Sequence, residues 1–166
     1  MVSKTKEFKK SIVAAHSFFM GSVNFLVISY PKGWQIHAGD FPPEVDRYTV
    51  KMGYAWVTVG NVKHYFSSND GKFVGFEVRV NKKIKKNKLR FLEVYDKGEV
   101  NVNGHEAEYV VGKFERGKLF KEQFNALIIR YYCDFTERYI ELYYYSKDIK
   151  ALYREFLGAV VDSTCH

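Results

Sequence analysis

The feature that most constrains this chain is the alternation of side chains on either side of residues 134–137. If these residues form a hairpin loop, one face of the two strands carries four cross-strand pairs: Cys133 with Arg138, Tyr131 with Ile140, Ile129 with Leu142 and Leu127 with Tyr144. The other face then places Arg130 opposite Glu141 and Tyr132 opposite Tyr139, which are favourable pairs. Because a slip of one residue would destroy both patterns, this register is predicted.

A third strand can be aligned with these two. Pairing Phe114 with Phe124 across a loop at residues 115–123 places Glu108 beside Arg130 and His105 beside Cys133. Strands are expected at residues 55–59, 73–80, 90–95, 99–102, 105–114, 124–133 and 138–145. The 17% of aromatic residues suits such a sheet, because flat rings pack well on a pleated surface. We therefore expect an antiparallel sheet of about six or seven strands.

Residues 146–164 are predicted to form the closing helix. Ser146 is a good N-cap, and Asp148 would place a carboxylate in the first turn, where it complements the helix dipole. The apolar residues recur at the spacing of one helix face: Ile149, Leu152, Tyr153, Phe156, Leu157, Val160 and Val161. We expect this face to pack on the apolar side of the sheet.

Residues 1–22 are predicted to form an N-terminal helix. Its apolar side chains recur at helical spacing: Phe8, Ile12, Ala15 and Phe19. The segment superficially resembles an export signal, but His16 interrupts its apolar part and no clean cleavage site follows. We therefore expect a cytoplasmic protein, with residues 1–166 forming a single domain and no membrane-spanning segment.

Residues 24–36 suggest a strand, a turn and a second extended segment. Pro31 ends ladder pairing, Gly33 permits the turn, and Trp34 can fold back over the sheet. This Tyr-Pro-Lys-Gly-Trp run resembles the opening motif of the PsbP-like family, which includes an extrinsic photosystem subunit and an import factor that binds the GTPase Ran. The Asn-Gly turn at residues 102–107 and the closing helix agree with that pattern. The resemblance implies an α+β fold of a mostly non-enzymatic family, an α/β/α sandwich with the sheet flanked by an N-terminal and a C-terminal helix.

Cys133 and Cys165 are predicted to meet at one end of the sheet. A strand of about eight residues and a helix over residues 146–163 both span about 26 Å, so a helix that runs back over the strand ends near the turn at 134–137. His105 and His166 would lie close by.

Three states of these cysteines are compatible with the sequence. A disulfide would stabilise the fold by roughly 3 to 4 kcal/mol in the chain-entropy model. Alternatively, two thiolates and two imidazoles form an acceptable zinc site, although no metal or other cofactor is expected, or the thiols stay unlinked as small apolar groups. A cytosolic disulfide is unusual outside hyperthermophiles. The abundant lysine and glutamate of this chain are typical of hyperthermophilic proteins.

A basic run lies between two predicted strands: Lys82, Lys83, Lys85, Lys86, Lys88 and Arg90. With the net charge of +7, it allows a nucleic-acid partner bound through phosphate contacts. The alternative is a solvated hairpin extension or edge strand whose lysines discourage pairing with another chain. No aromatic residues are interleaved for base stacking, and no known nucleic-acid-binding module is recognised. We favour the edge interpretation.

A different surface is predicted on the polar side of the last hairpin, at Arg130, Tyr132, Tyr139, Glu141 and Tyr143. If the N-terminal helix covers these side chains they are core; otherwise they form the best surface for docking a partner. No phosphate-binding loop, nucleophile elbow or zinc-protease helix occurs in the chain, so no catalytic residue is assigned.

The expected function is that of a non-enzymatic binding or scaffold protein that holds a macromolecule, most simply another protein, through a sheet face or loop end. Two alternatives stay open: a basic nucleic-acid-associated protein that uses residues 82–90, and a metal-dependent activity at the cysteines and histidines.

Overall fold

The computed structural model describes residues 8–17, 22–38, 63–83, 91–116 and 122–165. These residues form nine strands and one helix: β1 (Phe8–Ser17), β2 (Ser22–Pro31), β3 (Trp34–Ala38), β4 (Lys63–Ser68), β5 (Phe73–Asn81), β6 (Phe91–Val102), β7 (His105–Arg116), β8 (Glu122–Cys133), β9 (Arg138–Ser146) and α2 (Ile149–Val160).

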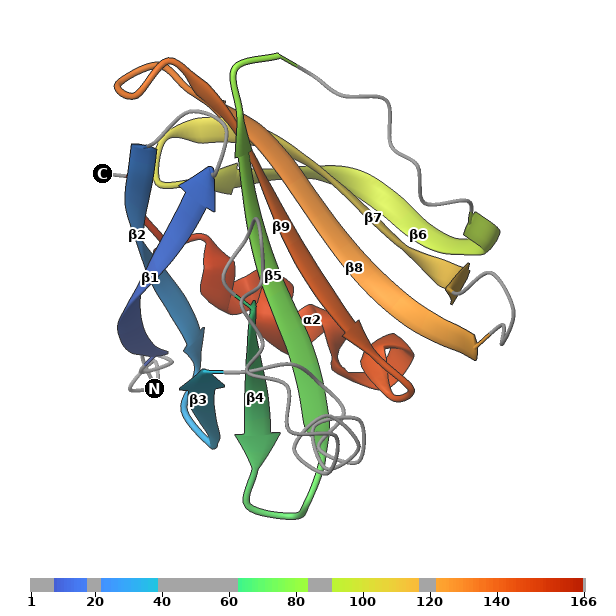
Figure 1. Ribbon diagram of the computed structural model, residues 1–166. Coiled ribbons are helices and arrows are strands. Elements are labelled where there is room, and N and C mark those ends of the chain that lie inside the picture. Colours follow the sequence, from blue (N-terminus) through green and yellow to red (C-terminus); the bar gives the residue numbers. More distant parts are fainter. Residues whose placement is uncertain (1–7, 18–21, 39–62, 84–90, 117–121, 166) are drawn as a thin grey trace, which may run out of the picture.

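Seven strands form one antiparallel sheet in the order β3-β4-β5-β9-β8-β7-β6. The strands β1 and β2 form a separate two-stranded ribbon, which lies beside α2 (Figure 1). Val13 of β1 and Ile28 of β2 share one core with Leu142 of the sheet and Phe156 of the helix. The ribbon and the helix therefore cover the same face of the large sheet.

The predicted α/β/α sandwich is wrong, because residues 8–17 form a strand and α2 is the one helix of the described residues. The error has a simple physical cause. Residues four apart, such as Phe8 and Ile12, share a face in a helix, but they also share a face in a strand. Within residues 8–13 of the strand, the side chain of Val13 is buried, with 1% exposed, whereas that of Ile12 is 72% exposed.

The predicted registers of the last three strands are confirmed. Arg130 pairs with Glu141 between β8 and β9, and Glu108 pairs with Arg130 between β7 and β8. The expected strands at residues 90–95 and 99–102 are one strand, β6, with irregularities near its start. The strand β4 was not predicted from the sequence, and the expected strand at 55–59 lies outside the described residues.

Helix α2 is shorter than predicted, because Ser146 ends β9 and Asp148 is the N-cap. The Ser146 hydroxyl donates to the Phe73 carbonyl oxygen at 2.7 Å and accepts from the Asp148 amide at 3.1 Å, so it joins the sheet to the helix start. Four members of the predicted apolar face are buried against the sheet: Ile149, Leu152, Phe156 and Val160. The position of the helix is thus confirmed, but its ends are not.

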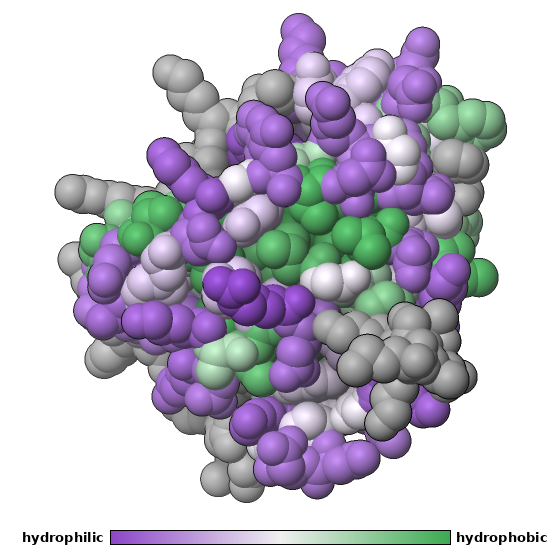
Figure 2. Space-filling model, turned by 180° about the vertical axis from the view of Figure 1, so that it is seen from behind, coloured by the Kyte–Doolittle hydropathy of each residue, from purple (hydrophilic) through white to green (hydrophobic). Residues whose placement is uncertain are grey.

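The sheet carries apolar clusters on both faces. The main core lies beneath α2 and the ribbon, where Trp34 meets Phe156 with ring centroids 5.1 Å apart. On the opposite face a second cluster gathers six buried side chains: Phe114, Phe124, Ala126, Ile128, Tyr143 and Tyr145. From behind, hydrophobic side chains gather near the middle of a mainly hydrophilic surface (Figure 2). Among the described residues, no helix has the length and apolar character needed to cross a membrane.

Candidate functional site

Cys133 and Cys165 form a disulfide, with their Cα atoms 6.5 Å apart. Their predicted meeting is therefore confirmed, although the helix ends five residues before Cys165. An extended segment completes the distance: Thr164 exchanges two backbone hydrogen bonds with Val27 of β2, and the Ser163 hydroxyl accepts from the buried Ser29 amide at 2.9 Å. Disulfides persist mainly in oxidising compartments and in hyperthermophiles, so the cytoplasmic location stays a prediction.

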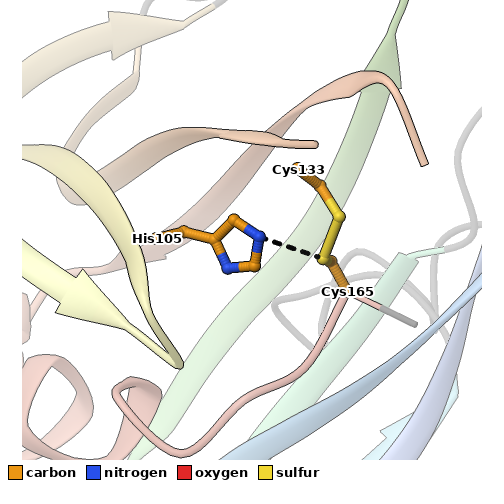
Figure 3. A group of neighbouring side chains, drawn as sticks. All are labelled: His105, Cys133 and Cys165. Carbon is orange, nitrogen blue, oxygen red and sulfur yellow. Dashed lines mark hydrogen bonds between the residues drawn. A yellow bond between two sulfur atoms is a disulfide. The ribbon is translucent and has the colours of Figure 1, made fainter. Parts of the chain in front are cut away.

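His105 completes a compact group with this disulfide (Figure 3). It follows a tight turn in which Asn103 and Gly104 both have positive φ, of 47° and 87°, as a type I′ hairpin turn requires. Its Nε2 atom lies 3.9 Å from the Cys165 sulfur and 3.1 Å from Asp134 Oδ1. The turn between β6 and β7 thus brings the imidazole to the turn between β8 and β9. His166 lies outside the described residues.

Both ring nitrogens of His105 face acceptor oxygens, Nδ1 that of the Val102 carbonyl and Nε2 that of the Asp134 carboxylate. Nδ1 lies 3.1 Å from the carbonyl oxygen of Val102, which can only accept, so Nδ1 must donate. In the neutral ring Nε2 then presents a lone pair toward the sulfurs and toward the carboxylate of Asp134. Asp134 was not predicted as a member of this group, although its position next to Cys133 in the sequence could have indicated it.

The polar face of the sheet, opposite α2, carries a row of charged residues across five strands. Cross-strand pairing aligns Glu99, Glu108, Arg130, Glu141 and Arg79 in that order. Arg130 Nη2 lies 3.5 Å from the buried carboxylate of Glu141. This pair neutralises the centre of the row.

Tyr143 and Arg79 complete the buried part of this face. The Tyr143 hydroxyl donates to Glu141, and the Arg79 guanidinium lies 4.4 Å from the centre of the Tyr143 ring. Burial, followed by the hydrogen bond and negative charge of Glu141, raises the pKa of Tyr143 to about 12. Burial disfavours the charge of Arg79, but Glu77, at 3.1 Å, leads the interactions that leave its pKa above the ordinary value.

Beside these buried groups the polar face is hollowed. A depression of about 500 Å³ is lined by Lys97, Glu99, Glu108, Ile128 and Arg130, among others. An adjoining one of about 250 Å³ shares Glu99, Glu108 and Arg130 and adds Glu106, Tyr132 and Tyr139. We call the two together the acidic trough.

Three carboxylates of the acidic trough are exposed: those of Glu99, Glu106 and Glu108. Glu99 and Glu108 are direct cross-strand neighbours, an arrangement of like charges that destabilises a sheet. Within the described parts of the chain, none of the three forms an ion pair. Glu99 and Glu106 were not predicted as site residues, although a type I′ turn at Asn103-Gly104 pairs β6 with β7 so that Glu99 lies opposite Glu108 and Glu106 lies two positions from Glu108 along β7.

The predicted docking residues therefore divide into two groups. Tyr132 is 44% exposed and Tyr139 is half-buried, and their ring centroids lie 4.9 Å apart at the trough. Glu141 and Tyr143 are buried, so they support the surface and do not face solvent. An N-terminal helix over these side chains would have made them part of the core. Residues 8–17 instead form β1, which packs in the same layer as α2.

The basic run is described only in part. Lys82 and Lys83 follow β5 and are exposed, while Lys85, Lys86, Lys88 and Arg90 lie outside the described residues. Its role in binding nucleic acid stays a prediction.

No protein-family model matches this chain, and no curated protein is significantly similar to it in sequence. The resemblance to the PsbP-like family consequently stays a prediction.

Proposed function

We propose that the protein is a non-enzymatic binding protein that holds a basic segment of a partner protein in the acidic trough. The observation that carries the proposal is the set of three exposed carboxylates without ion pairs in the described structure, two of them directly opposite each other. The repulsion between neighbouring carboxylates destabilises the folded protein, and a cation that binds between them relieves this repulsion.

The other residues of the trough suit the same ligand. With Arg130 paired to Glu141, carboxylates outnumber the remaining cation, Lys97. The rings of Tyr132 and Tyr139 can take a lysine or arginine side chain against their faces. The trough is thus acidic in a chain of net charge +7, and a phosphate backbone would be repelled there.

Binding of fluorescent peptides, followed by anisotropy, tests the proposal. We expect a poly-arginine peptide to bind in a salt-dependent way and a poly-glutamate peptide not to bind. The double variant Glu99→Gln/Glu108→Gln should lower the affinity about tenfold or more, because two charge-assisted hydrogen bonds are lost. The matched control Glu93→Gln/Glu137→Gln removes two exposed carboxylates outside the trough and should bind like the natural protein.

Equal affinities in all three proteins, or binding of poly-glutamate alone, would contradict the proposal. Duplex and single-stranded DNA oligonucleotides serve as further probes for the alternative based on residues 82–90. Salt-sensitive DNA binding that the glutamate variants leave unchanged would favour that alternative.

A further inference from the structure

We propose that the reduced protein binds one zinc ion through Cys133, Cys165, His105 and Asp134, so that disulfide and metal are alternative states of one site. This inference does not depend on the acidic trough, which lies on the polar face of the sheet. It rests on the spacing of the ligand atoms and on the orientation of His105.

The spacing suits tetrahedral zinc. Zinc–sulfur bonds of about 2.3 Å and zinc–nitrogen bonds of about 2.0 Å place neighbouring ligand atoms about 3.5 to 3.8 Å apart. The Cys165 sulfur and His105 Nε2 are 3.9 Å apart, and the three ligand atoms of His105, Cys133 and Cys165 all lie within 4.8 Å of one another. Once the sulfur–sulfur bond is broken, the two sulfurs can separate by rotation of the side chains.

The orientation of His105 is the second, independent observation. Its Nδ1 proton is committed to the Val102 carbonyl, which is the contact that typically orients a zinc-binding histidine. Nε2 then faces Asp134 Oδ1 at a distance of 3.1 Å. A lone pair on Nε2 and the carboxylate oxygen are both acceptors, so a proton or a metal cation must lie between them. A zinc ion bound by both atoms satisfies both lone pairs.

Asp134 would supply the fourth ligand: its Oδ1 lies 3.1 Å from His105 Nε2, outside the compact group of His105, Cys133 and Cys165, so its exposed side chain would rotate toward the sulfurs. Structural zinc sites are almost always four-coordinate, and carboxylate oxygen is an accepted ligand. The side chain of Asp134 is 87% exposed, whereas both cysteines are buried. The metal would therefore enter from the side of the β8–β9 turn.

The change of state balances chemically. A thiol reductant supplies two electrons and two protons and becomes a disulfide. A phosphine supplies two electrons and becomes a phosphine oxide with the oxygen atom of water, whose two protons go to the sulfurs, so either reductant leaves two thiols. Zinc binding then releases the two thiol protons and leaves two thiolates on the metal. Zinc itself has no redox chemistry, so the return needs an oxidant: a small-molecule disulfide takes two electrons from the thiolates and leaves as two thiols, the sulfur–sulfur bond forms again, and the zinc ion is released.

The test compares oxidised protein with protein reduced by a phosphine, each given zinc or Co²⁺, freed of excess metal and assayed by elemental analysis and visible absorption. We expect one zinc per reduced chain and none per oxidised chain. Co²⁺ should give the d–d bands of a tetrahedral ion together with thiolate charge-transfer bands. An octahedral cobalt spectrum, or equal zinc contents in the two states, would overturn the proposal.

His105→Gln is the decisive variant, because it keeps both cysteines and therefore the disulfide. We expect its reduced form to bind zinc at least tenfold more weakly, with circular dichroism confirming that the oxidised form is folded. Asp134→Asn should also weaken binding, whereas Glu137→Gln, an exposed acid in the same turn, should not. A zinc affinity of reduced His105→Gln or Asp134→Asn equal to that of the reduced natural protein would overturn the four-ligand site. If His105→Gln fails to fold, the rise in thermal unfolding temperature that zinc causes in the reduced natural protein, absent from the oxidised one, decides the matter.

Discussion

Tyr131 and Tyr144 bury hydroxyl groups that have no hydrogen-bond partner among the described residues. Their rings nevertheless fill the main core: the Tyr144 ring lies 4.9 Å from that of Phe76 and 5.4 Å from that of Phe156, between centroids. Burial raises the pKa of both phenols, and Tyr131 adds to the effect on Tyr144. Ionisation of these two buried tyrosines would therefore destabilise the folded protein.

We expect the free energy of unfolding to fall as the pH rises above about 10, the ordinary pKa of tyrosine. Below that pH both states hold the phenol protons, so these groups cause no change. Above it the unfolded chain releases protons that the folded protein keeps, and the folded state loses stability until its own raised pKa values are reached. Tyr143, whose pKa is raised to about 12, acts in the same direction. Urea unfolding between about pH 8 and pH 11 measures this slope.

Tyr144→Phe separates this effect from other alkaline changes. It removes a hydroxyl without a partner in the described structure, so stability at neutral pH should be equal or higher. The alkaline slope should become shallower by about 1.4 kcal/mol per pH unit, the value for one proton. An unchanged slope would show that Tyr144 ionises in the folded protein as it does in the unfolded chain.

At the scale of elements, β6 is the edge strand whose geometry depends on one glycine of its neighbour. The pairing of β6 with β7 is irregular between Phe91 and Glu93 and again between Val94 and Asp96. Opposite this region, a Cβ atom on Gly112 would lie only 2.6 Å from the Phe91 ring and would collide with the Glu93 carbonyl. The irregular edge therefore requires glycine at this position.

Gly112→Ala should lower the free energy of unfolding by about 1 to 3 kcal/mol, because the backbone of β6 must shift. Gly158→Ala is the matched control with the opposite sign. Gly158 lies on the exposed side of α2 with open space around its Cα, and alanine should stabilise the helix by about 1 kcal/mol. Urea unfolding measures both; a neutral Gly112→Ala would mean that β6 does not approach Gly112 as described.

At the scale of the whole molecule, the segment after α2 connects three parts of the fold. It bonds to Val27 of β2 through Thr164, accepts from the Asn103 amide at 2.9 Å through the Val161 carbonyl, and joins the end of β8 through the disulfide. The cysteines are 32 positions apart, so the bond closes a loop that contains β9 and α2.

Loss of this bond should lower the free energy of unfolding by about 4 kcal/mol in the chain-entropy model. Either reduction of the natural protein or the variant Cys133→Ala/Cys165→Ala should show the loss, measured by urea unfolding with a chelator present to exclude stabilisation by zinc. The reductant should have no effect on the double variant. Two free thiols in the unreduced, denatured protein would contradict the disulfide itself.

The sequence by itself determined the arrangement of β7, β8, β9 and α2, because strand alternation and helical spacing are local patterns. It also indicated that Cys133, Cys165 and His105 meet, since the lengths of those elements follow from the same patterns. It did not determine β1, whose Phe8 and Ile12 share a face in a strand as well as in a helix.

Only the tertiary structure decided that β5 pairs with β9, which places Arg79 beside Glu141, and that the ribbon lies on the side of α2. It also decided that Asp134 reaches His105 and that three glutamates line one trough. The physical reason is the same in each case. Turns and side-chain periods define the register of consecutive strands, whereas contacts between distant segments depend on which faces cover one another in the folded chain.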